Sequence, residues 1–357
     1  MEQMNMEQEN KMLVSFCVIA YNEEKYLGSL FQDILNQDYD HKHIEVVLVD
    51  SMSTDTTKAM MNEFAKKYEN EFFGIKVADN PKKKQSSGWN TAIPMASGDI
   101  IIRVDAHSKV TENFVSNNVR CMESGEDICG GPRPNLIEDS TPWKETLLLA
   151  ESSLFGSSIA SYRRDGERSY VKSMFHAAYR REVFKKVGGF NENLGRTEDN
   201  ELHYRMRQAG YKFCFDPSIN SYQYTRSTLG KMLKQKYGNG YWIGLTVGVC
   251  PGCISIFHFV PFAFIMGILL TSVLAALGIW QLGALMWSLY WCLAVVMAVV
   301  AVKGQKKHLV QLVLPGLFFL LHVSYGIGTL VGVIKMPFKR RKLKDCTEAV
   351  NIKTAMS

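Results

Sequence analysis

Two short apolar runs that each end in an aspartate constrain the fold of this chain more than any other feature. The first is Ile-Glu-Val-Val-Leu-Val-Asp at residues 44–50, and the second is Asp-Ile-Ile-Ile-Arg-Val-Asp at residues 99–105. Continuous runs of this length and composition are typical of strands that are buried on both faces of a parallel sheet. Since the carboxyl ends of parallel strands meet at one edge, we expect Asp50 and Asp105 to lie at that edge.

Helical patterns alternate with strand patterns through the first part of the chain. Strand-like runs occur at 14–20, 44–49, 73–78 and 100–104, and segments with helical spacing of apolar residues lie between them. Strands that alternate with helices predict an α/β fold with a mostly parallel, doubly wound sheet. The loop at 21–23 follows the first strand and is therefore expected at the same ligand-binding edge.

The later part of the chain is apolar enough to enter a membrane. Asp, Glu, Lys and Arg are absent from 237–302 and again from 309–334. A bilayer-spanning helix needs roughly 20 apolar residues. About three transmembrane segments are therefore expected, at about 254–277, 282–302 and 309–334.

Basic residues flank these apolar segments, and the net charge of the chain is +6. This arrangement fits anionic lipid headgroups and the positive-inside rule better than it fits nucleic acid, so no nucleic-acid partner is expected. Three spans conflict with the rule, because they place the basic residues 339–342 opposite the basic loop 303–307. Pro315 and the glycines at 326, 328 and 332 leave open a break or a re-entrant turn in the last segment.

Eight cysteines are scattered along the chain, and the only Cys-x-x-Cys pair is Cys250 and Cys253. No second ligand pair accompanies it, so a turn near the membrane is favoured over a metal or redox site. Scattered cysteines are most simply read as thiols in a reducing compartment.

Two further motifs carry chemistry. Asp105-Ala106-His107 places two potential metal ligands one residue apart, and Thr197-Glu198-Asp199 opens a helical segment. A carboxylate such as Asp199 can act as a general base, although an acidic pair at a helix N-terminus is also favoured by the helix dipole. A nucleotide site, a metal site and a base, in that order, are what transfer of a sugar from a nucleotide donor requires.

These motifs, in this order and spacing, resemble the family 2 glycosyltransferases, which are inverting enzymes with the GT-A fold. The resemblance is greatest to the exopolysaccharide branch that contains the succinoglycan glucosyltransferases. It covers about residues 15–242, and the matching stretches are 15–24, 49–55, 88–90, 98–99, 105–107, 130–132, 180–184, 188–190 and 197–199.

The resemblance implies a doubly wound mixed sheet and a set of site residues. Asp199 is the expected catalytic base with Glu198 beside it, and Glu198 is expected to raise the pKa of Asp199 by like-charge repulsion. Asp105 and His107 are the expected ligands of a divalent metal, Mn²⁺ or Mg²⁺, and this ligand pair suits Mn²⁺ better. The residues expected to bind the nucleotide sugar are Ala20, Tyr21, Glu23, Asp50, Ser51, Gly88, Asn90, Asp105 and Ala106.

Three positions depart from the family pattern. Ser51 stands where the family often has a second acidic residue, and His107 replaces the usual second aspartate of the metal motif. The Gln-x-x-Arg-Trp signature of processive members is absent, and residues 235–242 stand in its place. One sugar per encounter is therefore expected rather than polymerisation.

The domain boundaries follow from these features. A disordered tail is expected at 1–12 and a basic tail at 336–357. Between them we expect the GT-A domain at 13–230, an amphipathic interfacial segment at 231–253 and the transmembrane segments within 254–335.

The expected reaction moves a sugar, with glucose as the first candidate, from a UDP-sugar to a polyprenyl-diphosphate-linked saccharide. The expected location is the plasma membrane, as a multi-pass protein with its catalytic domain in the cytoplasm, where nucleotide sugars are made. The alternatives are a polyprenyl-phosphate glycosyltransferase, a catalytically silent nucleotide-sugar-binding regulator, and a transporter or scaffold. The long irregular region at 121–173 favours a larger acceptor, with Trp143 and Tyr162 as candidate stacking residues.

Overall fold

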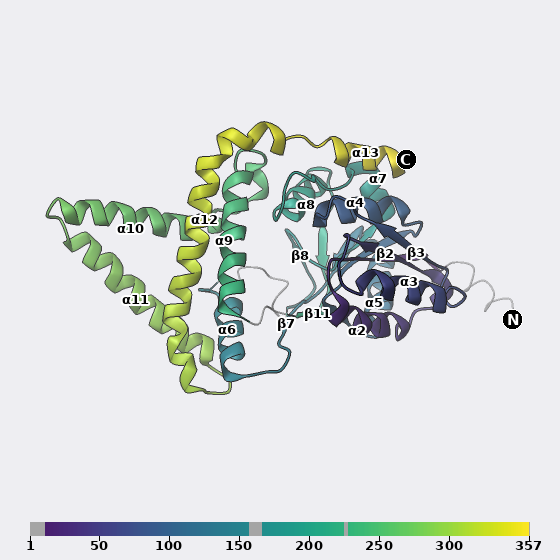
Figure 1. Cartoon of the computed structure of the whole chain (residues 1–357), viewed down its shortest axis with the longest axis horizontal. Helices are drawn as coiled ribbons and strands as arrows, with labels where there is room; N and C mark the ends of the chain where they lie inside the picture. Colours follow the sequence, from purple (N-terminus) through teal and green to yellow (C-terminus); the bar gives the residue numbers. More distant parts are fainter. Residues whose placement is uncertain (1–10, 157–165, 225–227, 357) are drawn as a thin grey trace. The chain divides into compact units, whose positions relative to one another are not determined.

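The computed structural model describes residues 11–156, 166–224 and 228–356 (Figure 1). It separates into two compact units. The sheet unit comprises the chain up to Pro134, the part that ends at Gln223 and the C-terminal segment that starts at Asp345. The helical unit comprises the segments that start at Asn135 and at Tyr224, and the second of these ends at Lys344. The predicted tail at 1–12 lies almost entirely outside the described residues, as does Tyr162.

Four parallel strands form the first half of the central sheet, in the order β3-β2-β1-β4. Strands β1 and β2 are buried along their whole length, which explains why their sequences are continuously apolar rather than alternating. The strands expected at 14–20, 44–49, 73–78 and 100–104 are thus confirmed. Their observed bounds are β1 Val14–Ala20, β2 Ile44–Asp50, β3 Gly74–Asp79 and β4 Ile100–Asp105.

The second half makes the sheet mixed, as the resemblance implied. Strand β9 runs antiparallel to β4 and β6, whereas β10 runs parallel to β6 and antiparallel to β8. A separate short ladder pairs β5 with β11 and places Gln223 opposite Ser108. The bounds are β5 Ser108–Val110, β6 Ile128–Gly130, β8 Ser169–Val171, β9 Ala178–Arg180, β10 Phe213–Phe215 and β11 Ser221–Tyr224.

Helices cover both faces of the sheet, because successive residues of a buried strand point to opposite sides. Phe16 on β1 packs in one core with α2, α3 and α5. Its neighbour Cys17 packs in a second core with α4, α7, α8 and α13. The bounds are α2 Glu24–Leu35, α3 Thr57–Lys67, α4 Gln85–Met95, α5 Phe114–Glu123, α7 Arg181–Val187, α8 Glu198–Gln208 and α13 Thr347–Met356.

The predicted basic tail at 336–357 includes a segment that packs on the sheet. The segment from Asp345 belongs to the sheet unit. The reason is that Ile352 and Met356 of α13 are buried in the second core beside Trp89. The amide of Gly189 also donates to the carbonyl of Ala349 at 3.0 Å.

The helical unit contains β7 and five α-helices within its described residues. Helices α9 and α12 run side by side in the same direction, and α10 and α11 form a hairpin that projects away from them (Figure 1). Three helical segments of the described chain are long and apolar enough to span a membrane, namely Ile256–Ala276, Gln281–Val302 and Leu309–Leu343. The bounds are β7 Asn135–Leu136, α6 Pro142–Ser152, α9 Leu229–Thr246, α10 Val260–Ala276, α11 Gln281–Val302 and α12 Leu314–Leu343.

Glycines let α9 and α12 approach until their backbones touch. A Cβ atom at Gly240 would overlap the carbonyl oxygen of Tyr325, and one at Gly328 would overlap the carbonyl oxygen of Tyr237. Gly244 and Gly332 are equally crowded by the opposite helix. Small residues spaced by four are a known way to pack apolar helices closely. The glycines of the last apolar segment therefore mark a packing face rather than a break, and α12 is one continuous helix.

This packing predicts that Gly240→Ala destabilises the protein although alanine favours helix. The matched control is Gly230→Ala on the same helix, because a Cβ atom there meets nothing within 4 Å. We expect Gly240→Ala to lower stability by about 1–3 kcal/mol, the usual cost of overpacking, and Gly230→Ala to be neutral or slightly stabilising. Thermal unfolding in detergent measures both, and equal melting temperatures would contradict the packing.

Candidate active site

The carboxyl ends of β1, β2 and β4 meet at one edge, where Asp50 and Asp105 were expected. Ala20 lies opposite Asp50, and Ile19 lies opposite Asp105. Asp50 is buried, and its carboxylate accepts the amide hydrogen of Ser53 at 3.1 Å. The aspartate therefore shapes the turn that follows β2 and also places an acidic group at the edge.

The other residues predicted to bind the nucleotide sugar differ in what they present at this edge. Tyr21 is half exposed, whereas the side chains of Ala20 and Ala106 are buried in the core, so that only their backbones can meet a ligand. The hydroxyl of Ser51 accepts a hydrogen bond from the Asn80 amide at 3.0 Å.

Gly88 and Asn90 lie on α4 and act mainly within the protein. A Cβ atom at Gly88 would lie 3.2 Å from Nδ2 of Asn80 and 3.3 Å from Cγ2 of Ile19. The amide of Asn90 donates to the carbonyl of Phe190 at 2.9 Å, and its oxygen accepts the Phe190 amide hydrogen at 2.7 Å. Asn90 thus holds the loop that precedes α8.

Asp105 and His107 converge on the side chain of Gln223. The Nε2 atom of Gln223 lies 2.9 Å from Nε2 of His107 and 3.4 Å from Oδ2 of Asp105. The other ring nitrogen of His107, Nδ1, lies 3.0 Å from Oε1 of Glu23. When Nδ1–H donates a hydrogen bond to Glu23, the lone pair of the neutral ring lies on Nε2. Metal-binding histidines use this arrangement.

The groups around this pair keep the Asp105 carboxyl ionised. Burial alone would raise the pKa of Asp105, but contacts with His176 and the charges of His107 and Arg133 hold that pKa below its usual value. Burial lowers the pKa of His107, but the hydrogen bond with Glu23 and the charge of Asp105 outweigh burial and raise it. Burial lowers the pKa of His176 to about 4, so this ring is neutral at pH 7.

The two ligands fit an ion that a nucleotide helps to hold. Within the part of the chain that the structure describes, no group of three or more His, Cys, Asp or Glu side chains could hold a metal by itself. Mg²⁺ and similar ions are often bound by one or two protein ligands together with substrate phosphates. Asp105 and His107, which both approach Gln223, match that type of site.

Asp199 is held by a buried ion pair with Arg103. The Nη2 atom of Arg103 lies 3.0 Å from Oδ1 of Asp199, and both side chains are nearly inaccessible to solvent. The guanidinium also lies 4.5 Å from the ring centroids of Trp89 and Phe190. Since Arg103 and Asp105 are two residues apart on β4, they share a face of the sheet. The expected base and the expected metal ligand are therefore linked through one strand.

Glu198 carries the large pKa shift of the acidic pair. Burial, followed by the negative charge of Asp199, raises its pKa to about 8. Its Oε2 atom is buried, and it has no hydrogen-bond partner among the residues that the structure describes. Like-charge repulsion within the pair, which the sequence led us to expect, contributes to the raised pKa of Glu198. At pH 7 this carboxyl group is mostly protonated.

Several contributing residues were not predicted to form the site. Gln223 and His176 had no motif to reveal them, because each is far in sequence from the aspartate that it approaches. Lys82 and Lys84 bond to Glu192. The guanidinium of Arg180 donates to the backbone carbonyl of Glu126.

The sequence of the chain is similar to those of known glycosyltransferases. Residues 15–188 match the sequence profile of glycosyl transferase family 2. The chain is 26% identical over 328 residues to the dolichyl N-acetyl-alpha-D-glucosaminyl phosphate 3-beta-D-2,3-diacetamido-2,3-dideoxy-beta-D-glucuronosyltransferase of Methanococcus voltae, which covers 90% of this chain and 97% of that protein. It is 29% identical over 222 residues to the succinoglycan biosynthesis protein ExoA of Rhizobium meliloti (strain 1021), which covers 61% of this chain and 65% of that protein.

A solved structure shows the same fold over most of the chain. The mannosyltransferase PcManGT of Pyrobaculum calidifontis, in complex with GDP-Man and Mn²⁺, aligns with a TM-score of 0.51 at 18% sequence identity. The alignment covers 94% of this chain and 89% of that one. Residues 15–188 thus form a domain of glycosyl transferase family 2, and the named relatives support a glycosyltransferase.

Proposed function

We propose that this glycosyltransferase moves a sugar from a UDP-sugar to a lipid-linked saccharide, with inversion and with a divalent metal. The observation that carries the proposal is the link along β4. Arg103 fixes Asp199 by a 3.0 Å ion pair, and Asp105 stands two residues further along the same strand. A base and a ligand for the leaving diphosphate are thereby held by one rigid element.

The donor lies along the edge formed by β1, β2 and β4. A carboxylate at Asp50 can accept the N3–H of uracil, a charge-assisted hydrogen bond that cytosine cannot make. Tyr21, which is half exposed beside it, offers an aromatic face to the base. UDP-glucose is the first donor to test, by resemblance to the exopolysaccharide branch.

Asp105 and His107 would hold the divalent metal, and Mn²⁺ suits a carboxylate and an imidazole. When bound, the ion neutralises the charge that develops on the leaving diphosphate. His107 would have to give up its hydrogen bond with Gln223 to hold the ion. Glu23 would keep the Nε2 lone pair of His107 available by accepting a hydrogen bond from Nδ1–H.

Asp199 is the general base. Its Oδ1 atom is held by Arg103, and we assign Oδ2 to the acceptor hydroxyl. The hydroxyl oxygen attacks the anomeric carbon, its proton passes to Asp199, and the bond from that carbon to the diphosphate breaks. Glu198, protonated at pH 7, lets Asp199 carry the only negative charge of the pair.

The acceptor is a sugar carried on a polyprenyl phosphate or diphosphate. The name of the Methanococcus voltae relative describes a dolichyl-linked sugar as its acceptor, and that relative matches nearly the full length of this chain. The apolar helices provide the membrane setting that such an acceptor requires. This similarity favours a lipid-linked sugar over a bare polyprenyl phosphate.

The direct test is donor turnover by the full chain in detergent. We expect UDP release that requires Mn²⁺, one UDP-sugar and a lipid fraction with polyprenyl-linked sugars. Polyprenyl phosphate alone and the diphosphate-linked sugar are separate arms that identify the acceptor. Metal-dependent UDP binding without turnover of any donor would support the silent regulator instead.

Asp199 and Glu198 are distinguished by isosteric substitutions. We expect Asp199→Asn to lower kcat by more than about a hundredfold while UDP affinity stays nearly unchanged, because a base is lost but the donor edge is intact. Glu198→Gln imitates the protonated glutamate and should keep most of the activity at pH 7. If Glu198 were the base, Glu198→Gln would instead be the inactive variant.

The pH dependence of the reaction rate provides the control for these two substitutions. The wild-type rate should fall as pH rises through about 8, where Glu198 ionises beside Asp199, and Glu198→Gln should lack this transition. The folded protein keeps this proton to about pH 8, whereas an ordinary glutamate loses it near 4.5, so the contribution of Glu198 to stability falls across that window. Thermal unfolding should therefore show a gain for Glu198→Gln at pH 8 that is absent at pH 4.

We further propose that only the α10–α11 hairpin crosses the membrane. The chain enters the helical unit after Gln223 and leaves it at Lys344, and both ends join the sheet unit. A chain that starts and ends in one soluble unit crosses a bilayer an even number of times. Helices α9 and α12 run in the same direction. If this pair crossed the membrane, the first residue of α9 and the last residue of α12 would therefore lie on opposite sides of it.

Exposure agrees with this assignment. Among the described residues, α10 fully buries only Ile265, and α11 fully buries only Ala294 and Ala298, so much of their apolar surface is left for lipid. Helix α12 packs on α9 and exposes a narrower stripe, which suits a helix that lies in the interface. The stripe consists of Leu320, Ile327, Ile334 and Phe338.

Epitope tags after Gly278, after Gly304 and at the C-terminus test the topology in sealed vesicles. We expect the Gly304 and C-terminal tags on the side of the sheet unit and the Gly278 tag on the opposite side. Three crossings would instead separate the C-terminal tag from the Gly304 tag. Placement of the sheet unit on the cytoplasmic side follows from the location of nucleotide sugars.

A further inference from the structure

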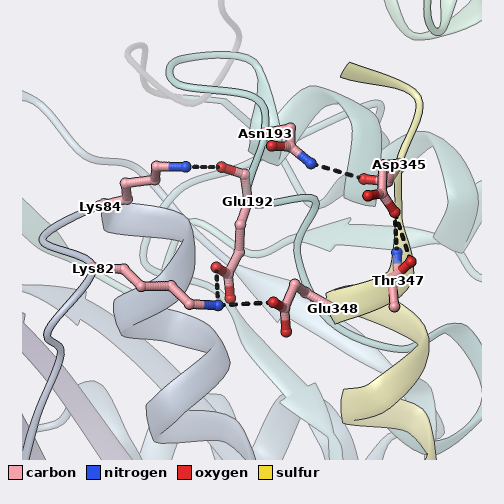
Figure 2. Close-up of a pocket in the computed structure, with 7 residues that line it drawn as sticks. All are labelled: Lys82, Lys84, Glu192, Asn193, Asp345, Thr347 and Glu348. Carbon is pink, nitrogen blue, oxygen red and sulfur yellow. Dashed lines mark hydrogen bonds and ion pairs between the residues drawn. The ribbon is translucent and has the colours of Figure 1, made fainter. Parts of the chain in front are cut away.

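The C-terminal segment Asp345–Met356 is fastened to the sheet unit by one bridging lysine. The Nζ atom of Lys82 lies 2.8 Å from Oε2 of Glu192 and 2.9 Å from Oε1 of Glu348, as Figure 2 shows. Lys82 follows β3, Glu192 lies in the loop before α8, and Glu348 is on α13. Three parts of the chain that are far apart in sequence thus meet at one ammonium group.

Other bonds tie the same segment to the same loop. The side-chain amide of Asn193 donates to the carbonyl of Asp345 at 3.1 Å, as Figure 2 shows. At the start of the loop, the amide of Gly189 donates to the carbonyl of Ala349 at 3.0 Å. A Cβ atom at Gly188 would overlap that carbonyl oxygen, and Gly188 has a φ of +84°, so a larger residue there is excluded on two grounds.

The inner side of α13 reaches the residues that support the base. Ile352 and Met356 are buried in one core with Trp89 and Phe190. Those two rings enclose the guanidinium of Arg103, which is paired with Asp199. The segment therefore contacts both the loop that leads to Asp199 and the aromatic rings that hold its partner.

A polar cavity remains beneath the bridge. It has a volume of about 360 Å³. Lys82, Glu192 and Glu348 line it together with neighbouring polar groups. Half of the Lys82 side chain is exposed, so water reaches the ion pairs. Ion pairs that water reaches contribute little each, which is enough to bias a docked segment but not to lock it. The lining residues are Lys82, Lys84, Glu192, Asn193, Asp345, Thr347 and Glu348.

We propose that the C-terminal segment is a positioning element for the catalytic loop at residues 189–197, and that Lys82 holds the segment in place. Because this segment directly follows α12, the helix that packs on α9, it connects the helical unit to the residues ahead of Glu198 and Asp199. When the C-terminal segment leaves its position on the sheet unit, the loop at 189–197 loosens and Asp199 is misplaced. The edge that binds the donor is not disturbed. The catalytic part of this inference depends on the proposed function.

Substitutions in the ion-pair bridge, at Lys82 and Glu348, test the proposal in the full chain. The variants are Lys82→Met and Glu348→Gln, and Lys83→Met is the matched control because Lys83 is an exposed neighbour with the same charge. We expect Lys82→Met to lower kcat by about three- to tenfold, since small displacements of a catalytic group are costly, and to leave the KM for the UDP-sugar within about twofold. Hydrogen exchange at the amides of 189–197 should become faster in the same variant and stay unchanged in Lys83→Met.

A conservative substitution distinguishes the ion pair from a general loss of folding. Lys82→Arg keeps a cation between Glu192 and Glu348, and it should retain most of the kcat that Lys82→Met loses. A Lys82→Arg variant that is as slow as Lys82→Met, or a lowered kcat without faster exchange in the loop, would overturn the proposal. If the wild type transfers no sugar at all, the proposed function fails instead, and the exchange data alone decide whether the segment holds the loop.

Discussion

The buried ion pair between Arg103 and Asp199 is the interaction on which the active site depends. An ion pair removed from water must be well formed, because loss of one partner leaves an uncompensated charge that costs about 3–5 kcal/mol. Here β4 supplies the arginine, α8 supplies the aspartate, and the rings of Trp89 and Phe190 cover the guanidinium. The docking of α13 supports those rings, so several elements converge on the placement of one carboxylate.

Local sequence patterns predicted the parts of this arrangement that are local. The strands before Asp50 and Asp105 were readable because buried parallel strands are continuously apolar, and the edge followed from their direction. Gln223 was not predicted, since it reaches Asp105 from 118 residues away through the pairing of β5 and β11. The bridge from Lys82 to Glu348 spans 266 residues, and a run of three lysines resembles an ordinary solvated loop.

The helical unit shows a pattern that was visible but interpreted differently. Gly240 and Gly244 are spaced by four, as are Gly328 and Gly332, which is the spacing of close helix contacts. From the sequence alone, the glycines of the last apolar segment were interpreted as a possible break in the helix, because propensity alone disfavours glycine within a helix. Partner helices outweigh that propensity, and only the structure shows that α9 is the partner. The same pairing gives the direction of α12 and thereby the membrane order proposed above.

The measurement that tests the central claim most directly is a structure of the full chain with UDP and Mn²⁺. The account predicts uracil against Asp50, the ion on Oδ of Asp105 and Nε2 of His107, and the diphosphate on the same face of β4 as Arg103. Gln223 should no longer donate a hydrogen bond to His107. A nucleotide bound away from this edge, or an ion that contacts neither Asp105 nor His107, would contradict it.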